Sequence, residues 1–149
     1  MTDPNRPSPT ETTTTEPAPP THPGSCHCKA VRFEVDVDLA AGATRCNCTL
    51  CTKLMLTGVI VKPHQLRLVS GEEHLTSYPN AIGVRWFCKR CGVHLGGRGH
   101  LAELGGDFAS ANVNALDDVD PNPLPLAHWD GRHDNWYGGT RHEPWPIFA

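Results

Sequence analysis

Long hydrophobic segments are the first thing that this sequence lacks. No run approaches the roughly 20 apolar residues that span a bilayer, so we do not expect a membrane protein. The first ten residues, MTDPNRPSPT, contain no apolar stretch of the kind found in secretory signals. We therefore expect a cytoplasmic protein, in a compartment that keeps thiols reduced.

An excess of positive charge is also missing. Charged residues make up 19% of the 149 residues, and the net charge is −3. Proteins that bind nucleic acid through phosphate contacts carry clusters of Lys and Arg, and this chain has no such basic stripe. The composition therefore argues against nucleic acid as a partner.

Cysteine is present, but not at the density or in the even number of a disulfide scaffold. Such scaffolds have cysteine at roughly 8–10% of their positions, whereas this chain has 7 in 149 residues. An odd number of thiols cannot pair completely. The cysteines are better interpreted as metal ligands or nucleophiles.

Residues 1–23 form a tail rich in proline and threonine. They hold seven of the 14 prolines and seven threonines, but no Val, Ile, Leu, Phe, Trp, Tyr or Cys. A segment that buries no apolar surface cannot offset the entropy lost on ordering, so we expect it to be disordered. Residues 24–149 then form one folded domain, which is large enough for a hydrophobic core.

The folded part has the pattern of short strands. Residues 30–37 alternate apolar and polar side chains, which is typical of a strand with one buried face. Further runs of this kind are 55–61, 66–69, 74–78, 84–87, 93–95 and 108–113. We interpret the glycines between 96 and 106 as turns, and no long segment has the period and caps of a helix. The pattern predicts an all-β domain of short antiparallel sheets.

The cysteines fall into three groups, CHC at 26–28, CNCTLC at 46–51 and CKRCG at 88–92. Cys-x-x-Cys followed by glycine is the pattern of a zinc knuckle, in which a tight turn points backbone N–H groups at two thiolates. Cys26 and Cys28 share one face of an extended chain and are the natural partners. We therefore predict a closed structural zinc site made of Cys26, Cys28, Cys88 and Cys91.

Cys46, Cys48 and Cys51 remain, with no fourth cysteine. Three protein ligands are typical of a catalytic zinc, which keeps one position open for water or substrate. A site of three thiolates suits a soft ligand such as a substrate thiol. The spacing alone is equally compatible with closure by His27, His94 or His100, or with a disulfide and one free thiol. These alternatives stay open at the level of sequence.

Two other sets of residues are candidates for the site. Arg45, Lys53, Arg85 and Arg98 lie near the cysteines in sequence and could hold substrate carboxylates, although each is more simply a solvated charge. Aromatic residues gather near the C-terminus: Trp129, Trp136, Tyr137, Trp145 and Phe148. We favour a C-terminal segment that packs these aromatics on the sheet, with a lid or a dimer contact as alternatives. His133 and Asp134 matter only if they face the metal.

The cysteine segments together resemble the glutathione-dependent formaldehyde-activating enzyme family, which includes the centromere protein V domain. They are GSCHCKAVRF at 24–33, CNCTLC at 46–51 and FCKRCG at 87–92. The resemblance implies a zinc-stapled β fold of the Mss4-like type and two Zn²⁺ ions per chain. It assigns a structural zinc to Cys26, Cys28, Cys88 and Cys91, and a catalytic zinc to Cys46, Cys48 and Cys51. It also implies a carbon–sulfur lyase that adds glutathione to formaldehyde, giving S-hydroxymethylglutathione.

We therefore place a zinc-dependent thiol–aldehyde enzyme first among the functional hypotheses. Its partners would be a small thiol, such as glutathione, and an aldehyde, and a homodimer is compatible with the sequence. The second hypothesis is a zinc-stapled binding module without catalysis. The third is a redox or metal sensor, in which the three-cysteine loop loses zinc on oxidation.

Overall fold

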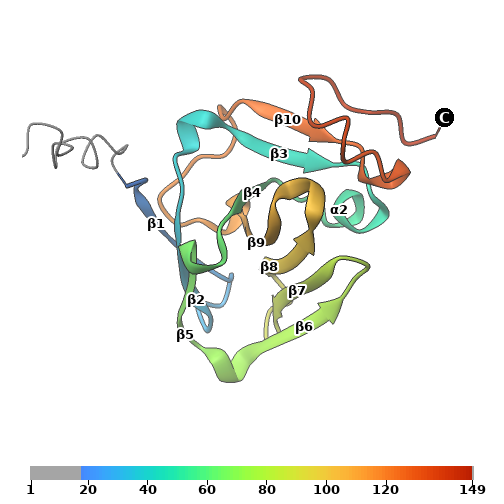
Figure 1. Cartoon of the computed structure of the whole chain (residues 1–149). Coiled ribbons are helices and arrows are strands. Elements are labelled where there is room, and N and C mark those ends of the chain that lie inside the picture. Colours follow the sequence, from blue (N-terminus) through green and yellow to red (C-terminus); the bar gives the residue numbers. More distant parts are fainter. Residues whose placement is uncertain (1–17, 149) are drawn as a thin grey trace, which may run out of the picture.

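The computed structural model describes residues 18–148 and consists mainly of two β-sheets (Figure 1). The strands are β1 Thr21–Ser25, β2 Arg32–Asp36, β3 Ala43–Cys46, β4 Gly58–Val61, β5 Leu66–Ser70, β6 Leu75–Pro79, β7 Gly83–Cys88, β8 His94–Leu101, β9 Gly106–Asn112 and β10 Leu126–Trp129. The α-helix is α2 Thr49–Leu54, and the short 3-10 segments are η1 Leu39–Ala41, η2 Pro63–Gln65, η3 Glu72–His74, η4 Ala102–Leu104, η5 Val113–Ala115 and η6 Gly131–His133. The predicted all-β class is confirmed. No helix in the described residues has the length and apolarity needed to cross a membrane.

The larger sheet contains one parallel pair of strands. Its order is β10-β3-β4-β9-β8-β7-β6, and the smaller sheet has the order β1-β2-β5. The pairs are antiparallel except β10 and β3, which run in the same direction. The prediction of antiparallel sheets alone is wrong at this pair. Parallel neighbours need a long connection, and the chain between β3 and β10 crosses the rest of the domain before it returns.

The ordered domain begins earlier than residue 24. β1 starts at Thr21 and pairs with β2 over five residues. The backbone oxygen of Pro23 also accepts a hydrogen bond from the N–H of Asp117, at 2.9 Å. The segment has no large apolar side chains, so composition hides this strand, which is positioned by backbone hydrogen bonds. The predicted disorder of residues 1–17 lies outside the described residues.

The predicted strand 55–61 is wrong at its start. Met55 ends helix α2 in the left-handed conformation, with φ of 49°, and its side chain is 80% exposed. Strand β4 begins only at Gly58. A helix of six residues is too short to show a clear hydrophobic period, so the apolar run seemed to belong to one strand.

The glycine-rich stretch is mostly strand, which corrects its interpretation as turns. Gly96 and Gly97 lie inside β8, between β7 and β9. A Cβ atom on Gly96 would overlap the carbonyl oxygen of Ser110, and one on Gly97 would overlap that of Val84. Glycine is therefore required here by the close approach of neighbouring strands. Gly105 does lie in a turn, and both it and Gly106, the first residue of β9, have positive φ.

Side chains from both sheets form one hydrophobic core. The inward face of the smaller sheet contributes Phe33 and Val35, and the larger sheet contributes Val59 and Leu95. Figure 1 shows that the end of β3, helix α2 and the C-terminal segment gather at one end of the larger sheet. Cys46, Cys48 and Cys51 lie at this end, because Cys46 is the last residue of β3 and the other two belong to the start of α2.

Candidate functional site

The structure brings the seven cysteines together in two groups that can each hold a metal ion. The four-cysteine group contains Cys26, Cys28, Cys88 and Cys91, and the three-cysteine group contains Cys46, Cys48 and Cys51. Within each group all ligand atoms lie within 4.8 Å of one another. All seven cysteines are free thiols, so the three-cysteine group contains no disulfide.

The four-cysteine group has the dimensions of a tetrahedral zinc site. With Zn–S bonds of about 2.3 Å, sulfurs at neighbouring corners of a tetrahedron lie about 3.8 Å apart. The Sγ atom of Cys28 lies 3.7 Å from that of Cys26 and 3.7 Å from that of Cys88. The donor set therefore fits zinc in both chemistry and spacing.

Backbone N–H groups point at the sulfurs of this group, as in a zinc knuckle. Val31 N donates to Cys26 Sγ at 3.3 Å, and Arg90 N donates to Cys88 Sγ at 3.3 Å. Backbone N–H groups of Cys28 and Val93 lower the pKa of Cys91 to about 6, because they stabilise its thiolate. These contacts favour the deprotonated form that metal binding needs.

Two ligands of the four-cysteine group lie in the hydrophobic core, Cys91 is half-buried beside it, and Cys28 is exposed. Cys26 and Cys88 are each 1% exposed and belong to the main core cluster. The group joins the turn between β1 and β2 to the end of β7, so it links the two sheets. A metal held here would act on the stability of the fold.

The three-cysteine group is built around the start of a helix. Cys48 is the N-cap of α2, and its Sγ accepts a hydrogen bond from Cys51 N at 3.3 Å. Hydrogen bonds from the thiols of Cys46 and Cys51 lower the pKa of Cys48, so the first thiolate of the group forms there. A tetrahedral ion held by the three sulfurs would have a fourth corner without a protein ligand among the described residues.

None of the three candidate histidines joins this group in the described part of the chain. His100 bonds Asp107 at 2.7 Å. His94 is buried against Phe87, with ring centroids 5.1 Å apart, and neither ring nitrogen has a hydrogen-bond partner among the described residues. Burial lowers the pKa of His94 to about 4, helped by the charge of Arg85, so its imidazole is neutral.

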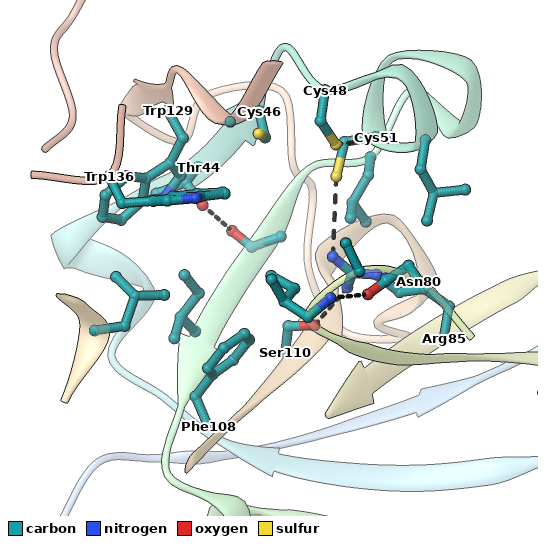
Figure 2. A pocket seen from close by; sticks show the side chains of 18 of the residues that line it. Thr44, Cys46, Cys48, Cys51, Asn80, Arg85, Phe108, Ser110, Trp129 and Trp136 are labelled. Carbon is teal, nitrogen blue, oxygen red and sulfur yellow. Dashed lines mark hydrogen bonds between the residues drawn. The ribbon is translucent and has the colours of Figure 1, made fainter. Parts of the chain in front are cut away.

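The three-cysteine group opens on a cavity of about 250 Å³ (Figure 2). Cys46, Cys48 and Cys51 all border it. Most of the remaining wall is apolar and includes Leu56, Ile82, Phe108, Trp129 and Trp136. The three-cysteine group therefore borders a space that a small molecule can enter.

Arg85 is the basic residue that the structure selects from the four candidates. Its Nη1 donates to Ser110 Oγ at 2.7 Å and its Nη2 points at Cys51 Sγ at 3.9 Å, as Figure 2 shows. Its Nε is buried and has no partner among the described residues. The other three candidates do not border the cavity: Arg45 bonds Thr57, Lys53 is exposed, and Arg98 lies over the ring of Trp86.

Asn47, which lies between Cys46 and Cys48, links the three-cysteine group to the C-terminal segment. Asn47 Nδ2 donates to Asp130 Oδ1 at 2.8 Å, and Asn47 Oδ1 accepts from Arg132 N at 2.9 Å. Arg132 Nε donates to the Asn47 backbone oxygen at 2.7 Å. Sequence reasoning missed this link, since Asn47 and Asp130 are 83 residues apart and Asn47 is not itself one of the cysteine ligands in the CNCTLC segment.

The same segment forms one wall of the cavity. Trp129 and Trp136 pack against each other with ring centroids 5.8 Å apart, and both border the cavity. Trp129 is the last residue of strand β10. His133 bonds Asp130 at 2.6 Å, whereas Asp134 borders the cavity. Trp129 and Trp136 thus form part of the site, whereas Tyr137 and Phe148 are 87% and 88% exposed and do not pack on the sheet as predicted.

Comparisons with known proteins agree with this architecture. A model of the family "Glutathione-dependent formaldehyde-activating enzyme" matches residues 21–129. A curated protein of Halomonas elongata, named "Putative glutathione-dependent formaldehyde-activating enzyme", is 36% identical over 82 residues, which cover 48% of this chain and 52% of that protein. The match thus spans about half the length of this relative. A crystal structure of a Rhodobacter sphaeroides protein is 30% identical, with a TM-score of 0.59, and covers 70% of this chain and 98% of its own.

The family match extends from the first described strand to the last, and it includes both cysteine groups and Arg85. The cysteine groups are also compatible with the zinc-stapled, Mss4-like fold that the resemblance implied. This chain belongs to the glutathione-dependent formaldehyde-activating enzyme family.

Proposed function

We propose that this protein is a zinc enzyme of the carbon–sulfur lyase type, which adds a thiol such as glutathione to a small aldehyde. The observation that carries the proposal is the difference between the two cysteine groups. The four-cysteine group supplies four ligands, two of them in the core, whereas the three-cysteine group supplies three ligands and borders a cavity. The first arrangement is typical of structural zinc and the second of catalytic zinc.

In this proposal Cys46, Cys48 and Cys51 hold the catalytic ion, and Cys26, Cys28, Cys88 and Cys91 hold the structural one. Zinc at the three-cysteine group supplies a Lewis acid that keeps a substrate thiol deprotonated near neutral pH. We also propose a cytoplasmic location, because a reducing compartment keeps such thiols available as ligands.

The bond changes of the addition balance without any further reactant. The thiolate sulfur gives an electron pair to the carbonyl carbon, and a carbon–sulfur bond forms. The π pair of the carbonyl group moves to its oxygen, which then takes up the proton that the thiol released. The reverse direction breaks the carbon–sulfur bond and returns the thiol and the aldehyde.

Arg85 is placed to stabilise the oxygen on which negative charge develops. Its Nη2 lies near the sulfur of Cys51 and its Nη1 is held by Ser110, so the guanidinium is fixed before substrate binds. A preorganised donor in a partly closed site stabilises an oxyanion without reorganisation at the moment of reaction. The apolar walls also limit the access of water to the reacting atoms.

The proposal is tested by the variant Cys46→Ser, with Thr52→Ser as the matched control. Thr52 is an exposed residue of α2 that does not border the cavity. The addition of glutathione to formaldehyde is followed by two-dimensional exchange NMR, which measures the rate at equilibrium. We expect Cys46→Ser to lose all acceleration above the uncatalysed rate, while its melting temperature stays near that of the parent.

Thr52→Ser should keep the full rate. A Cys46→Ser protein that catalyses the addition as well as the parent does would contradict the proposal. So would a Cys46→Ser protein that unfolds, because the three-cysteine group would then be a structural element.

A further inference from the structure

The cavity beside the three-cysteine group is larger and more apolar than formaldehyde requires. Its volume is about 250 Å³, whereas an engineered apolar cavity of about 150 Å³ already binds benzene. Formaldehyde has no carbon chain that such a space could contact. The space is that of a small molecule with an apolar body.

The walls of the cavity favour burial of hydrocarbon. Leu56 is 8% exposed and Phe108 is 7% exposed, so both are already held in place by the core. Trp129 and Trp136 add two packed indole rings from the C-terminal segment. Transfer of an apolar group from water to these surfaces is favourable in proportion to the area that is buried.

The position of Arg85 indicates which substrate enters the cavity. Its guanidinium lies between Cys51 and Ser110, on the wall of the cavity that the three cysteines also border. A carbonyl oxygen that accepts from Arg85 brings its carbon close to the three-cysteine group, since Arg85 Nη2 is 3.9 Å from Cys51 Sγ. The remaining substituent of that carbon then extends into the apolar part of the cavity.

A charged tripeptide thiol does not fit this space as well. Glutathione carries two carboxylates and an ammonium group, whereas Arg85 and Asp134 are the charged side chains on the cavity wall apart from the thiols. Burial of unpaired charges is costly. The charged ends of such a thiol therefore remain at the rim, and only its sulfur reaches the open corner.

We infer that the aldehyde substrate carries an apolar chain of about three to five carbons beyond the carbonyl group, bound in this cavity with its oxygen on Arg85. The number of carbons is an order-of-magnitude match to the cavity, by comparison with benzene in a smaller one. This inference rests on the proposed function and adds the substrate class to it.

The kinetic test compares formaldehyde, acetaldehyde, butanal and 3-methylbutanal with glutathione on the zinc-loaded full chain. Each enzymatic rate is divided by the uncatalysed rate of the same aldehyde, because the aldehydes differ in intrinsic reactivity. One methylene in an apolar enzyme pocket changes specificity by about 10–200-fold. We therefore expect the acceleration, as kcat/KM, to rise at least about tenfold from acetaldehyde to 3-methylbutanal.

A substitution that narrows the cavity should remove this preference. Ala81 is an exposed residue of the turn between β6 and β7 and borders the cavity, so Ala81→Phe adds a ring there with little effect on the core. Ala41→Phe is the matched control, since Ala41 is exposed and does not border the cavity. We expect the ratio of 3-methylbutanal to acetaldehyde acceleration to fall several-fold in Ala81→Phe and to stay unchanged in Ala41→Phe.

A binding measurement separates the inference from catalysis. The alcohol 3-methyl-1-butanol cannot react, and it should shift the indole N–H signals of Trp129 and Trp136 in a saturable way, whereas methanol should not. Acceleration of formaldehyde without a gain for longer aldehydes would overturn the inference and leave the proposed function standing. No acceleration for any aldehyde would overturn the proposed function, and with it the assignment of an aldehyde to this cavity.

Discussion

Gly131 allows a direct test of how tightly the C-terminal segment packs on the three-cysteine group. A Cβ atom built on Gly131 would lie 2.6 Å from Cys46 Sγ and 2.7 Å from Trp136 Cη2. Ordinary contacts between such atoms are about 3.5–4.0 Å. In Gly131→Ala, the sulfur of Cys46 or the backbone of η6 must therefore move by roughly 1 Å.

A metal site does not tolerate a displacement of that size. Ligand distances in metal sites hold to within about 0.2 Å, so we expect Gly131→Ala to lose the metal of the three-cysteine group. Overpacking of this kind costs about 1–3 kcal/mol, so the fold and the four-cysteine group should survive. The assay is the zinc content per chain, together with the melting temperature.

Gly58→Ala is the control for this variant. Gly58 also borders the cavity, but a Cβ atom there would meet Ala111 O at 3.5 Å and Leu56 Cγ at 3.7 Å, which are ordinary contacts. The Gly58→Ala protein should keep two zinc ions per chain, whereas the Gly131→Ala protein should keep one. A Gly131→Ala protein with two ions and unchanged resistance to a chelator would refute the reasoning.

Three further predictions follow from other parts of the structure. Cys88→Ser should unfold, because a structural zinc contributes about 10–16 kcal/mol and most domains are stable by only about 5–15 kcal/mol. Circular dichroism at 25 °C tests this, and a native spectrum would contradict it. Arg85→Met should lower kcat by about 10²-fold with the zinc content unchanged, and Arg85→Lys should recover part of the loss; loss of zinc would instead indicate a structural role. His94→Leu should stabilise the fold progressively as the pH falls, since burial lowers the pKa of His94 from 6.5 to about 4 and the unfolded chain therefore takes up this proton first. In the parent, the free energy of unfolding falls as the pH drops below 6.5, and at pH 5.5 this histidine has lowered it by about 1.4 kcal/mol, a loss that the variant does not share. Urea unfolding of both proteins at pH 7 and pH 5.5 measures the difference.

Much of the two cysteine groups could be predicted from the sequence, because the pairs Cys26/Cys28 and Cys88/Cys91 and the set Cys46–Cys51 are each local, although the two pairs meet across 60 residues. Cys88 and Cys91 sit in a knuckle with Gly92, whose φ of 79° is the conformation that the motif suggested. Cys46, Cys48 and Cys51 fall within six residues and need only a strand end and one helical turn to converge. The alternating pattern of residues 30–37 likewise predicted β2, with Phe33 and Val35 on its buried face.

The rest of the site depends on contacts between distant segments. Nothing in the sequence distinguishes Arg85 from Arg45 or Arg98; the pairing of β7 with β8, and of β8 with β9, brings it to Ser110 and Cys51. The link between Asn47 and Asp130 requires the parallel pairing of β3 with β10. Such pairings are set by the packing of the whole domain, which short-range patterns do not contain.

The central claim is that one cysteine group is closed and structural while the other is open and reactive. The most direct measurement is the number of zinc ions per chain, followed over time during treatment with chelators of increasing affinity for zinc. The account predicts two ions, of which one is removed rapidly without unfolding, and a Cys46→Ser protein that contains only the resistant ion. A single resistant ion in the parent chain, or two ions lost at the same rate, would contradict it.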